Sequence, residues 1–130
     1  VGEALLEPTR IYAQPIRKIL AHYPVKNVVH GIAHITVGGL CENIARIMPA
    51  NTRAILHRES WQVPNIFPWL QRSGNVKDDE MFRVFNMGIG MVVIVSAYYA
   101  GSVQRLLADA GVVNWKIGEV EAGQQGAELR

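Results

Sequence analysis

Apolar side chains recur at helical spacing in several stretches of the chain. The first of these stretches begins near Pro15, which suits a first helical turn, and it is stopped by Pro24. Its apolar residues fall at positions i, i+3, i+4 and i+7: Ile16, Ile19, Leu20 and Tyr23. Similar stripes, ended by Pro or Gly, predict further helices over residues 40–48, 65–73, 78–85 and 103–110.

Other stretches carry the patterns of β-strands. Residues 28–37 alternate and are rich in β-branched side chains, and residues 52–57 and 115–120 form two shorter candidates. Residues 89–95 are apolar almost without interruption, which is typical of a strand covered on both faces and predicts the centre of a sheet. Pro8 favours an extended conformation for residues 2–12, and residues 121–130 are expected to fray.

The order of these elements predicts an α+β fold, an α/β sandwich with a mixed sheet and helices. Strand, helix and strand follow one another twice, early and late, which predicts a split βαβ, ferredoxin-like core with added helices. A length of 130 residues allows one domain. We expect that domain over residues 1–121 and a flexible tail over residues 122–130.

Charge and cysteine content exclude several classes of protein. A net charge of +2 is too small for a nucleic-acid or anionic-membrane footprint. The single cysteine, Cys41, cannot form an internal disulfide, which favours a reducing compartment and predicts a cytoplasmic location. No apolar run approaches the roughly 20 residues that cross a bilayer, and the first residues lack the pattern of a signal peptide.

The segment from His34 to Gly39 ends a predicted strand and leads into a predicted helix. Its residues read His-Ile-Thr-Val-Gly-Gly. Glycines let the backbone approach a ligand, and the first amides of a helix are unpaired, so this loop could hold an anion such as a phosphate. The alternative is a plain turn, because the sequence matches neither the dinucleotide-binding fingerprint nor a P-loop.

Other chemical groups give weaker signals. His30 and His34 share one strand face, but no third metal ligand is evident, so we expect no metal site. Cys41 at a helix start could act as a nucleophile with His34, although a lone cysteine usually packs as a small hydrophobe. The polar group Thr9, Arg10 and Tyr12 lies in the half of the chain, residues 1–58, that holds seven Lys and Arg against three Asp and Glu. An arginine there suits phosphate or carboxylate, and the alternative is a solvated salt bridge.

Two further groups favour structural roles. Gly88 and Gly90 precede the apolar strand, where a missing side chain allows a bulge or a close approach. The aromatic cluster of Trp61, Phe67 and Trp69 predicts core packing, since no interleaved basic residues accompany it.

Nearly the whole chain, from Glu7 to Gly118, resembles the C-terminal domain of phosphoribosylformylglycinamidine cyclo-ligases, also called aminoimidazole ribonucleotide synthetases. The resemblance rests on the order and spacing of several short blocks. These blocks are Glu7 to Tyr12, His34 to Asn43, Ser60-Trp61, Trp69 to Gln71, Gly74 to Val76, Glu80-Met81, Phe85 to Met91 and Trp115 to Gly118.

The resemblance implies a ligase of purine biosynthesis that uses ATP to close formylglycinamidine ribonucleotide into aminoimidazole ribonucleotide. It implies that ATP and Mg²⁺ are bound mainly by an N-terminal domain that this chain lacks, and that the full enzyme is a homodimer. This chain would supply one wall of the cleft for a small phosphoribosyl substrate and be inactive alone. Alternatives are a related ATP-dependent phosphotransferase, of the selenophosphate synthetase or thiamine-monophosphate kinase type, and a standalone ligand-binding module.

The resemblance also implies roles for particular residues. His34 is the implied catalytic residue. The implied substrate and phosphate contacts are Thr9, Arg10, Tyr12, Thr36, Gly38, Gly39 and Asn43. The family usually has a glycine where this chain has Val37, and a valine would obstruct the loop if that position required positive φ.

Overall fold

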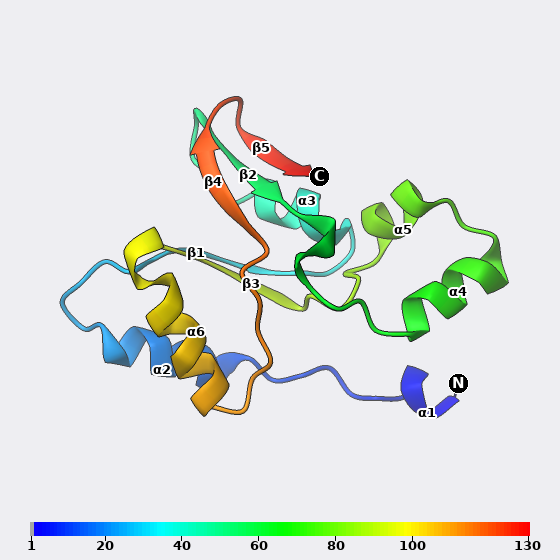
Figure 1. Cartoon of the computed structure of the whole chain (residues 1–130), viewed down its shortest axis with the longest axis horizontal. Coiled ribbons are helices and arrows are strands. Elements are labelled where there is room, and N and C mark those ends of the chain that lie inside the picture. Colours follow the sequence, from blue (N-terminus) through cyan, green and yellow to red (C-terminus); the bar gives the residue numbers. More distant parts are fainter. Residues whose placement is uncertain (1) are drawn as a thin grey trace.

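The computed structural model describes residues 2–130 as helices packed around two small sheets (Figure 1). Val1, the first residue of the expected domain, lies outside the described residues. The elements in chain order are α1 (Gly2–Leu5), α2 (Ala13–His22), β1 (Val29–His34), α3 (Gly39–Ala45), β2 (Thr52–Leu56), η1 (Arg58–Ser60), α4 (Ile66–Gly74), α5 (Asp78–Val84), β3 (Met91–Val95), η2 (Ala97–Tyr99), α6 (Ala100–Asp109), β4 (Gly118–Ala122) and β5 (Gly126–Leu129). The five longer helices and the strands predicted from residues 28, 52, 89 and 115 onward are confirmed, with shifted ends.

The strands confirm the α+β class but form two sheets in place of one. β1 and β3 form an antiparallel pair, while the second sheet has the order β4-β2-β5. That second sheet is mixed, because β2 runs antiparallel to β4 and parallel to β5. A single split βαβ sheet would have β2 and β4 in the same sheet as β1 and β3. Here β2 and β4 pair with each other, and Gly118 permits their approach because a Cβ there would collide with the carbonyl of Ile55.

The prediction that β3 lies at the centre of a sheet is therefore wrong, although the strand is partly buried on both faces. Among the described strands β3 pairs with β1 alone. Val92 and Ile94 pack against the larger hydrophobic core, and Val95 packs against a smaller one. The apolar run therefore indicated a strand that packs on both faces, which does not require a hydrogen-bonded strand on both edges.

The C-terminal residues also differ from the expected flexible tail. β5 extends along β2, and the backbone N–H of Arg130 donates to the carbonyl of Leu56 at 2.8 Å. Ala127 and Leu129 pack against the larger core, while Glu128 faces Arg53 on the exposed side. At the other end, residues 2–5 form a helical turn, α1, within the segment that was expected to be extended.

Two hydrophobic clusters hold these elements together. The larger cluster lies between α3, α5 and both sheets and includes Leu40, Ile44 and Met81, each almost fully buried. The smaller cluster of Ile19, Val28 and Val103 joins α2 and α6 to the β1–β3 pair, and the two helices lie side by side in Figure 1. Of the aromatic cluster predicted to pack in the core, Trp61 belongs to the larger core and Phe67 packs against it, but the prediction is wrong for Trp69, which is 38% exposed. None of the helices within residues 2–130 is long and apolar enough to cross a membrane.

Candidate functional site

A cleft of about 280 Å³ opens between the N-terminal segment, the end of β1 and the loop before β3. Nine residues line it: Thr9, Arg10, Tyr12, His34, Ile35, Thr36, Asn86, Gly88 and Gly90. Five of the eight residues expected in the site are thus brought together from two segments of the chain. These five are Thr9, Arg10, Tyr12, His34 and Thr36.

Tyr12 and His34 form an aromatic contact within the cleft. Their ring centroids lie 6.2 Å apart with an interplanar angle of 60°, an edge-on arrangement. The Tyr12 hydroxyl occupies the space that a side chain at position 90 would fill, so Gly90 is needed for the ring to lie there. A close approach by a ligand or another backbone was expected at Gly90, and the group that approaches is instead the Tyr12 side chain.

Arg10 supplies the positive charge of the cleft. Its side chain forms no ion pair with any residue from 2 to 130, and the residue is exposed. A guanidinium without a protein carboxylate is available to an anionic ligand. The salt-bridge alternative raised for Arg10 therefore has no support among the described residues.

The loop after β1 is a tight turn across residues 36–39. The N–H of Gly39 donates to the carbonyl of Thr36 at 3.2 Å, and Gly38 has φ 99° and ψ −2°. A positive φ at the third position is the mark of a type II turn, whose second position, here Val37, takes an ordinary φ. Val37 has no positive φ and is 85% exposed. The valine therefore does not strain the loop.

Asn43 is buried beneath this loop. Its side-chain Nδ2 donates to the carbonyls of Gly39 at 2.7 Å, Val37 at 3.2 Å and Thr36 at 3.3 Å. The donor group is thus used entirely by the protein, and Asn43 does not line the cleft. The side chain fixes the direction of the loop that carries Thr36.

Gly38 and Gly39 also lie outside the lining of the cleft. Gly39 has φ 62°, and a Cβ there would collide with the backbone carbonyl of Phe82 in α5. A Cβ on Gly38 would meet the carboxylate of Glu42, which folds back over the start of α3. Both positions therefore require glycine because of local packing. The Glu42 carboxylate already lies beside the first turn of α3.

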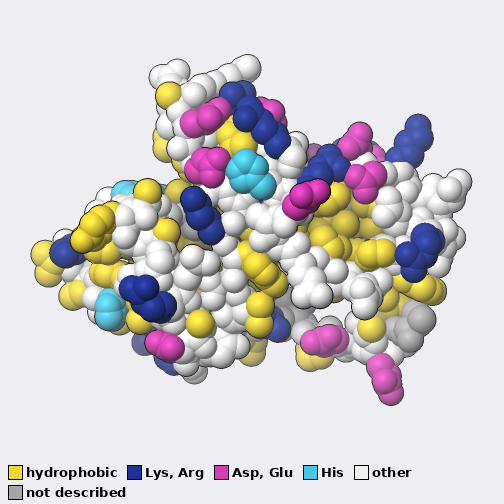
Figure 2. Space-filling model, in the orientation of Figure 1, with side chains coloured by type: hydrophobic (Ala, Val, Ile, Leu, Met, Phe, Trp, Pro, Cys, Tyr) yellow, Lys and Arg dark blue, Asp and Glu magenta, His cyan; other side chains and the backbone are white. Residues whose placement is uncertain are grey.

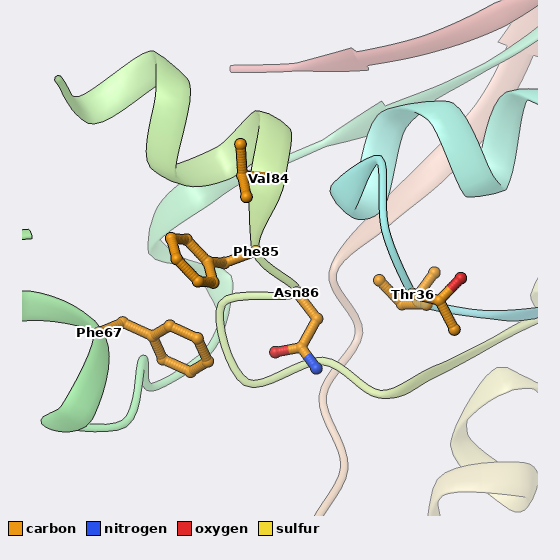
Figure 3. A pocket seen from close by; sticks show the side chains of 6 residues that line it. Thr36, Phe67, Val84, Phe85 and Asn86 are labelled. Carbon is orange, nitrogen blue, oxygen red and sulfur yellow. The ribbon is translucent and has the colours of Figure 1, made fainter. Parts of the chain in front are cut away.

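A second cavity of about 250 Å³ adjoins the first. Its walls are Ile35, Thr36, Phe67, Val84, Phe85 and Asn86, most of which are visible in Figure 3. The rings of Phe67 and Phe85 lie 6.0 Å apart, edge to face. The two cavities share one wall, formed by Ile35, Thr36 and Asn86. The first cavity is the polar half of the site, and the second, which Phe67 and Phe85 line, is the aromatic half.

Sequence reasoning missed Asn86 as a site residue. It opens a turn in which the N–H of Ile89 donates to the carbonyl of Asn86 at 2.9 Å, with positive φ at both Met87 (50°) and Gly88 (94°). This is the type I′ pattern, which favours Asn or Gly over Met at the first central position. The Asn-x-Gly pattern just before a strand was the available signal.

The remaining candidates from the sequence have ordinary partners. The ring Nε2 of His30 lies 2.8 Å from the Ser96 hydroxyl. Burial raises the pKa of the Cys41 thiol, which opposes a thiolate nucleophile. Within residues 2–130, no group of three or more His, Cys, Asp or Glu is placed to hold a metal ion.

Charged side chains of both signs gather over the three-stranded sheet, away from the cleft (Figure 2). Arg53 contacts Glu121 at 2.7 Å and Glu128 at 3.2 Å, and His57 Nε2 lies 3.0 Å from a Glu119 oxygen. The hydrogen bond from His57 holds the pKa of Glu119 below its ordinary value. In these exposed pairs Arg53 is already partnered by two carboxylates, so it is not available to an anionic ligand.

Comparison with known proteins identifies relatives along nearly the whole chain. The family described as AIR synthase related protein, C-terminal domain, matches residues 1–129. A phosphoribosylformylglycinamidine cyclo-ligase of Cupriavidus pinatubonensis is 49% identical over 124 residues, which is 95% of this chain and 34% of that protein. Proteins of the same name from Nitrosospira multiformis and Chromobacterium violaceum are each 48% identical, over 91% and 95% of this chain and 32% and 35% of their own length. The chain therefore spans about a third of the length of the relatives it matches.

Proposed function

The chain belongs to the family of AIR synthase related protein C-terminal domains, and from this premise we propose that it is the substrate-side domain of a phosphoribosylformylglycinamidine cyclo-ligase. The observation that carries the proposal is identity of 46–49% to proteins of that name across at least 91% of this chain. The full enzyme would use ATP to close formylglycinamidine ribonucleotide into aminoimidazole ribonucleotide. It would act in the cytoplasm on this small molecule, as a homodimer.

The polar half of the cleft suits the phosphoribosyl end of such a substrate. Arg10 offers a planar donor fork for a phosphate, and Thr9 and Thr36 add hydroxyl donors. Tyr12 and His34 lie edge-on beside them, where the imidazole can orient a polar group of the substrate or exchange a proton with it. Gly38, Gly39 and Asn43 would act indirectly by holding Thr36 in place.

The residues that line the cleft do not fit a magnesium site. Mg²⁺ prefers carboxylate oxygens, and no Asp or Glu lines the cleft. ATP, when bound, would supply the phosphoryl group that activates the formyl oxygen, and the N-terminal part of the enzyme would hold most of its phosphates.

The test is an assay of the full-length enzyme that carries this chain. We expect ATP-dependent formation of aminoimidazole ribonucleotide, and none from residues 1–130 alone. Arg10→Ala should lower kcat/KM by roughly 10- to 100-fold, the range for one hydrogen bond to a charged group. Arg17→Ala, which removes an exposed arginine of α2, is the matched control. A full-length enzyme that forms no aminoimidazole ribonucleotide would contradict the proposed activity.

A further inference from the structure

We propose that Asn86 is a ligand-positioning residue whose side-chain amide binds a planar head group of the ligand, and that the aromatic cavity beside it holds that group. The head group needs a carbonyl oxygen or an sp² nitrogen as hydrogen-bond acceptor. The inference deepens the proposed function and rests on it for the phosphoribosyl part of the ligand. It assigns the head group to a pocket that neither the sequence nor the relatives indicated.

Asn86 lies where the two cavities meet. Together with Ile35 and Thr36 it forms the wall shared by the polar and the aromatic half. Figure 3 shows its side chain between Phe67 and Thr36. A ligand with its phosphate near Arg10 and its head group in the second cavity would have to pass the Asn86 amide.

The Asn86 amide presents an unused donor to this junction. The N–H of Gly88 donates to Asn86 Oδ1 at 2.9 Å, and since a backbone N–H can only donate, the assignment of oxygen and nitrogen is fixed. Nδ2 makes no hydrogen bond to any residue from 2 to 130. No buried side-chain polar atom of this part of the chain lacks a partner, so the unpaired Nδ2 is accessible to solvent, on a residue that lines both cavities.

Core contacts fix the turn that carries Asn86, although the backbone conformation of Met87 is unfavourable. Met87 adopts φ 50°, an unfavourable conformation for a side chain of this kind, and is buried. Trp61 Nε1 donates to the Met87 carbonyl at 3.0 Å, and the Pro64 ring fills the space beside Gly88. A strained conformation fixed by two core contacts places the Nδ2 donor in one position, which reduces the entropy lost on binding.

The second cavity supplies the surface for a flat group. Phe67 and Phe85 present their rings at an interplanar angle of 62°, and Val84 closes one side. Such walls favour a planar, weakly polar group over a hydrated ion. The Thr36 hydroxyl and the Asn86 amide are the polar groups at its rim.

The experiment compares two ligands of the 130-residue chain by NMR titration of backbone amides. Aminoimidazole carboxamide ribonucleotide carries a phosphoribosyl group and a planar head, whereas ribose 5-phosphate carries only the first. We expect the first ligand to bind at least fivefold more tightly. Asn86→Asp keeps the acceptor for Gly88 and loses the donor. Asn86→Ser keeps an acceptor without adding charge, and its shorter side chain moves the remaining hydroxyl donor away from the position of Nδ2. Both variants should reduce the preference by roughly two- to tenfold, the range for one neutral hydrogen bond.

The controls separate this inference from a loss of folding and from the proposed activity. Asn27→Asp makes the same change in the loop between α2 and β1 and should leave the preference intact. Equal binding of the two ligands, no binding of either, or an unchanged preference in folded Asn86 variants would overturn the inference. Failure of turnover in the full-length enzyme, with the ligand preference intact, would overturn the proposed activity alone.

Discussion

The hydroxyl of Tyr12 lies directly against the α-carbon of Gly90, in the space that any other residue's Cβ would occupy. The two residues are far apart in sequence, one in the N-terminal segment and one in the loop before β3. Their contact brings the Tyr12 ring edge-on to His34 and closes one side of the cleft.

We expect Gly90→Ala to displace the Tyr12 ring with little loss of stability, because all three of the nearest atoms belong to that one movable side chain. The unfolding free energy should change by no more than about 1 kcal/mol. The NMR signals of the His34 ring should shift, and ribose 5-phosphate should bind more weakly. Gly101→Ala, at an open helical position, is the control and should leave both properties unchanged. An unmoved His34 signal in Gly90→Ala would show that Tyr12 is not displaced.

Gly39→Ala should be far more damaging than the same change at Gly111. Both residues have positive φ, which costs an alanine roughly 1–2 kcal/mol. At Gly111 the added methyl group meets nothing within 4 Å, whereas at Gly39 it collides with the Phe82 carbonyl. We expect a loss of about 3 kcal/mol or more at Gly39 and about 1 kcal/mol at Gly111, measured by urea denaturation. Equal losses would mean that α5 moves away at no cost.

Asn43 provides a test of the loop as a structural unit. Asn43→Ala removes the donor shared by three carbonyls in a buried site and should cost about 1–3 kcal/mol. Asn43→Asp should cost more, because it places a carboxylate against carbonyl oxygens. Asn114→Ala, which removes a half-buried amide bonded to two carbonyls, is the comparison. If Asn43→Asp unfolds no more easily than Asn43→Ala, the side chain at position 43 is not held against the three carbonyls in a buried site.

The sequence predicted most elements because their apolar spacing is local, but it missed contacts that depend on distant partners. β5 carries only Ala127 and Leu129 as inward apolar residues, and its pairing with β2 depends on a crossover through β4. The role of Asn43 depends on the directions of three backbone carbonyls in the turn of residues 36–39, and the spacing of residues along the sequence does not predict these directions. Asn86 could be recognised as a candidate site residue only from the structure, in which it lines both cavities.

Cys41 should react slowly with alkylating reagents. Burial among the core residues raises the pKa of its thiol, so the reactive thiolate is scarcer than in an exposed cysteine. At pH 8 the native chain should be modified by iodoacetamide more slowly than the chain unfolded in urea. Mass spectrometry follows the reaction at this single cysteine. A native rate equal to the unfolded rate would contradict the burial of the thiol.

The pairing of His57 with Glu119 predicts a loss of stability in acid. The hydrogen bond from His57 lowers the pKa of Glu119 from its ordinary 4.5, so the folded state holds this proton less readily than the unfolded state. The contribution is complete above pH 4.5 and is lost as the pH falls through the lower, folded-state pKa. Glu119→Gln should therefore reduce the slope of melting temperature against pH on the acid side, measured by circular dichroism. Glu59→Gln removes a carboxylate that forms no ion pair within residues 2–130, so it should leave the slope unchanged. If both variants keep the wild-type slope, other carboxylates, such as Glu128 beside Arg130, dominate the acid transition.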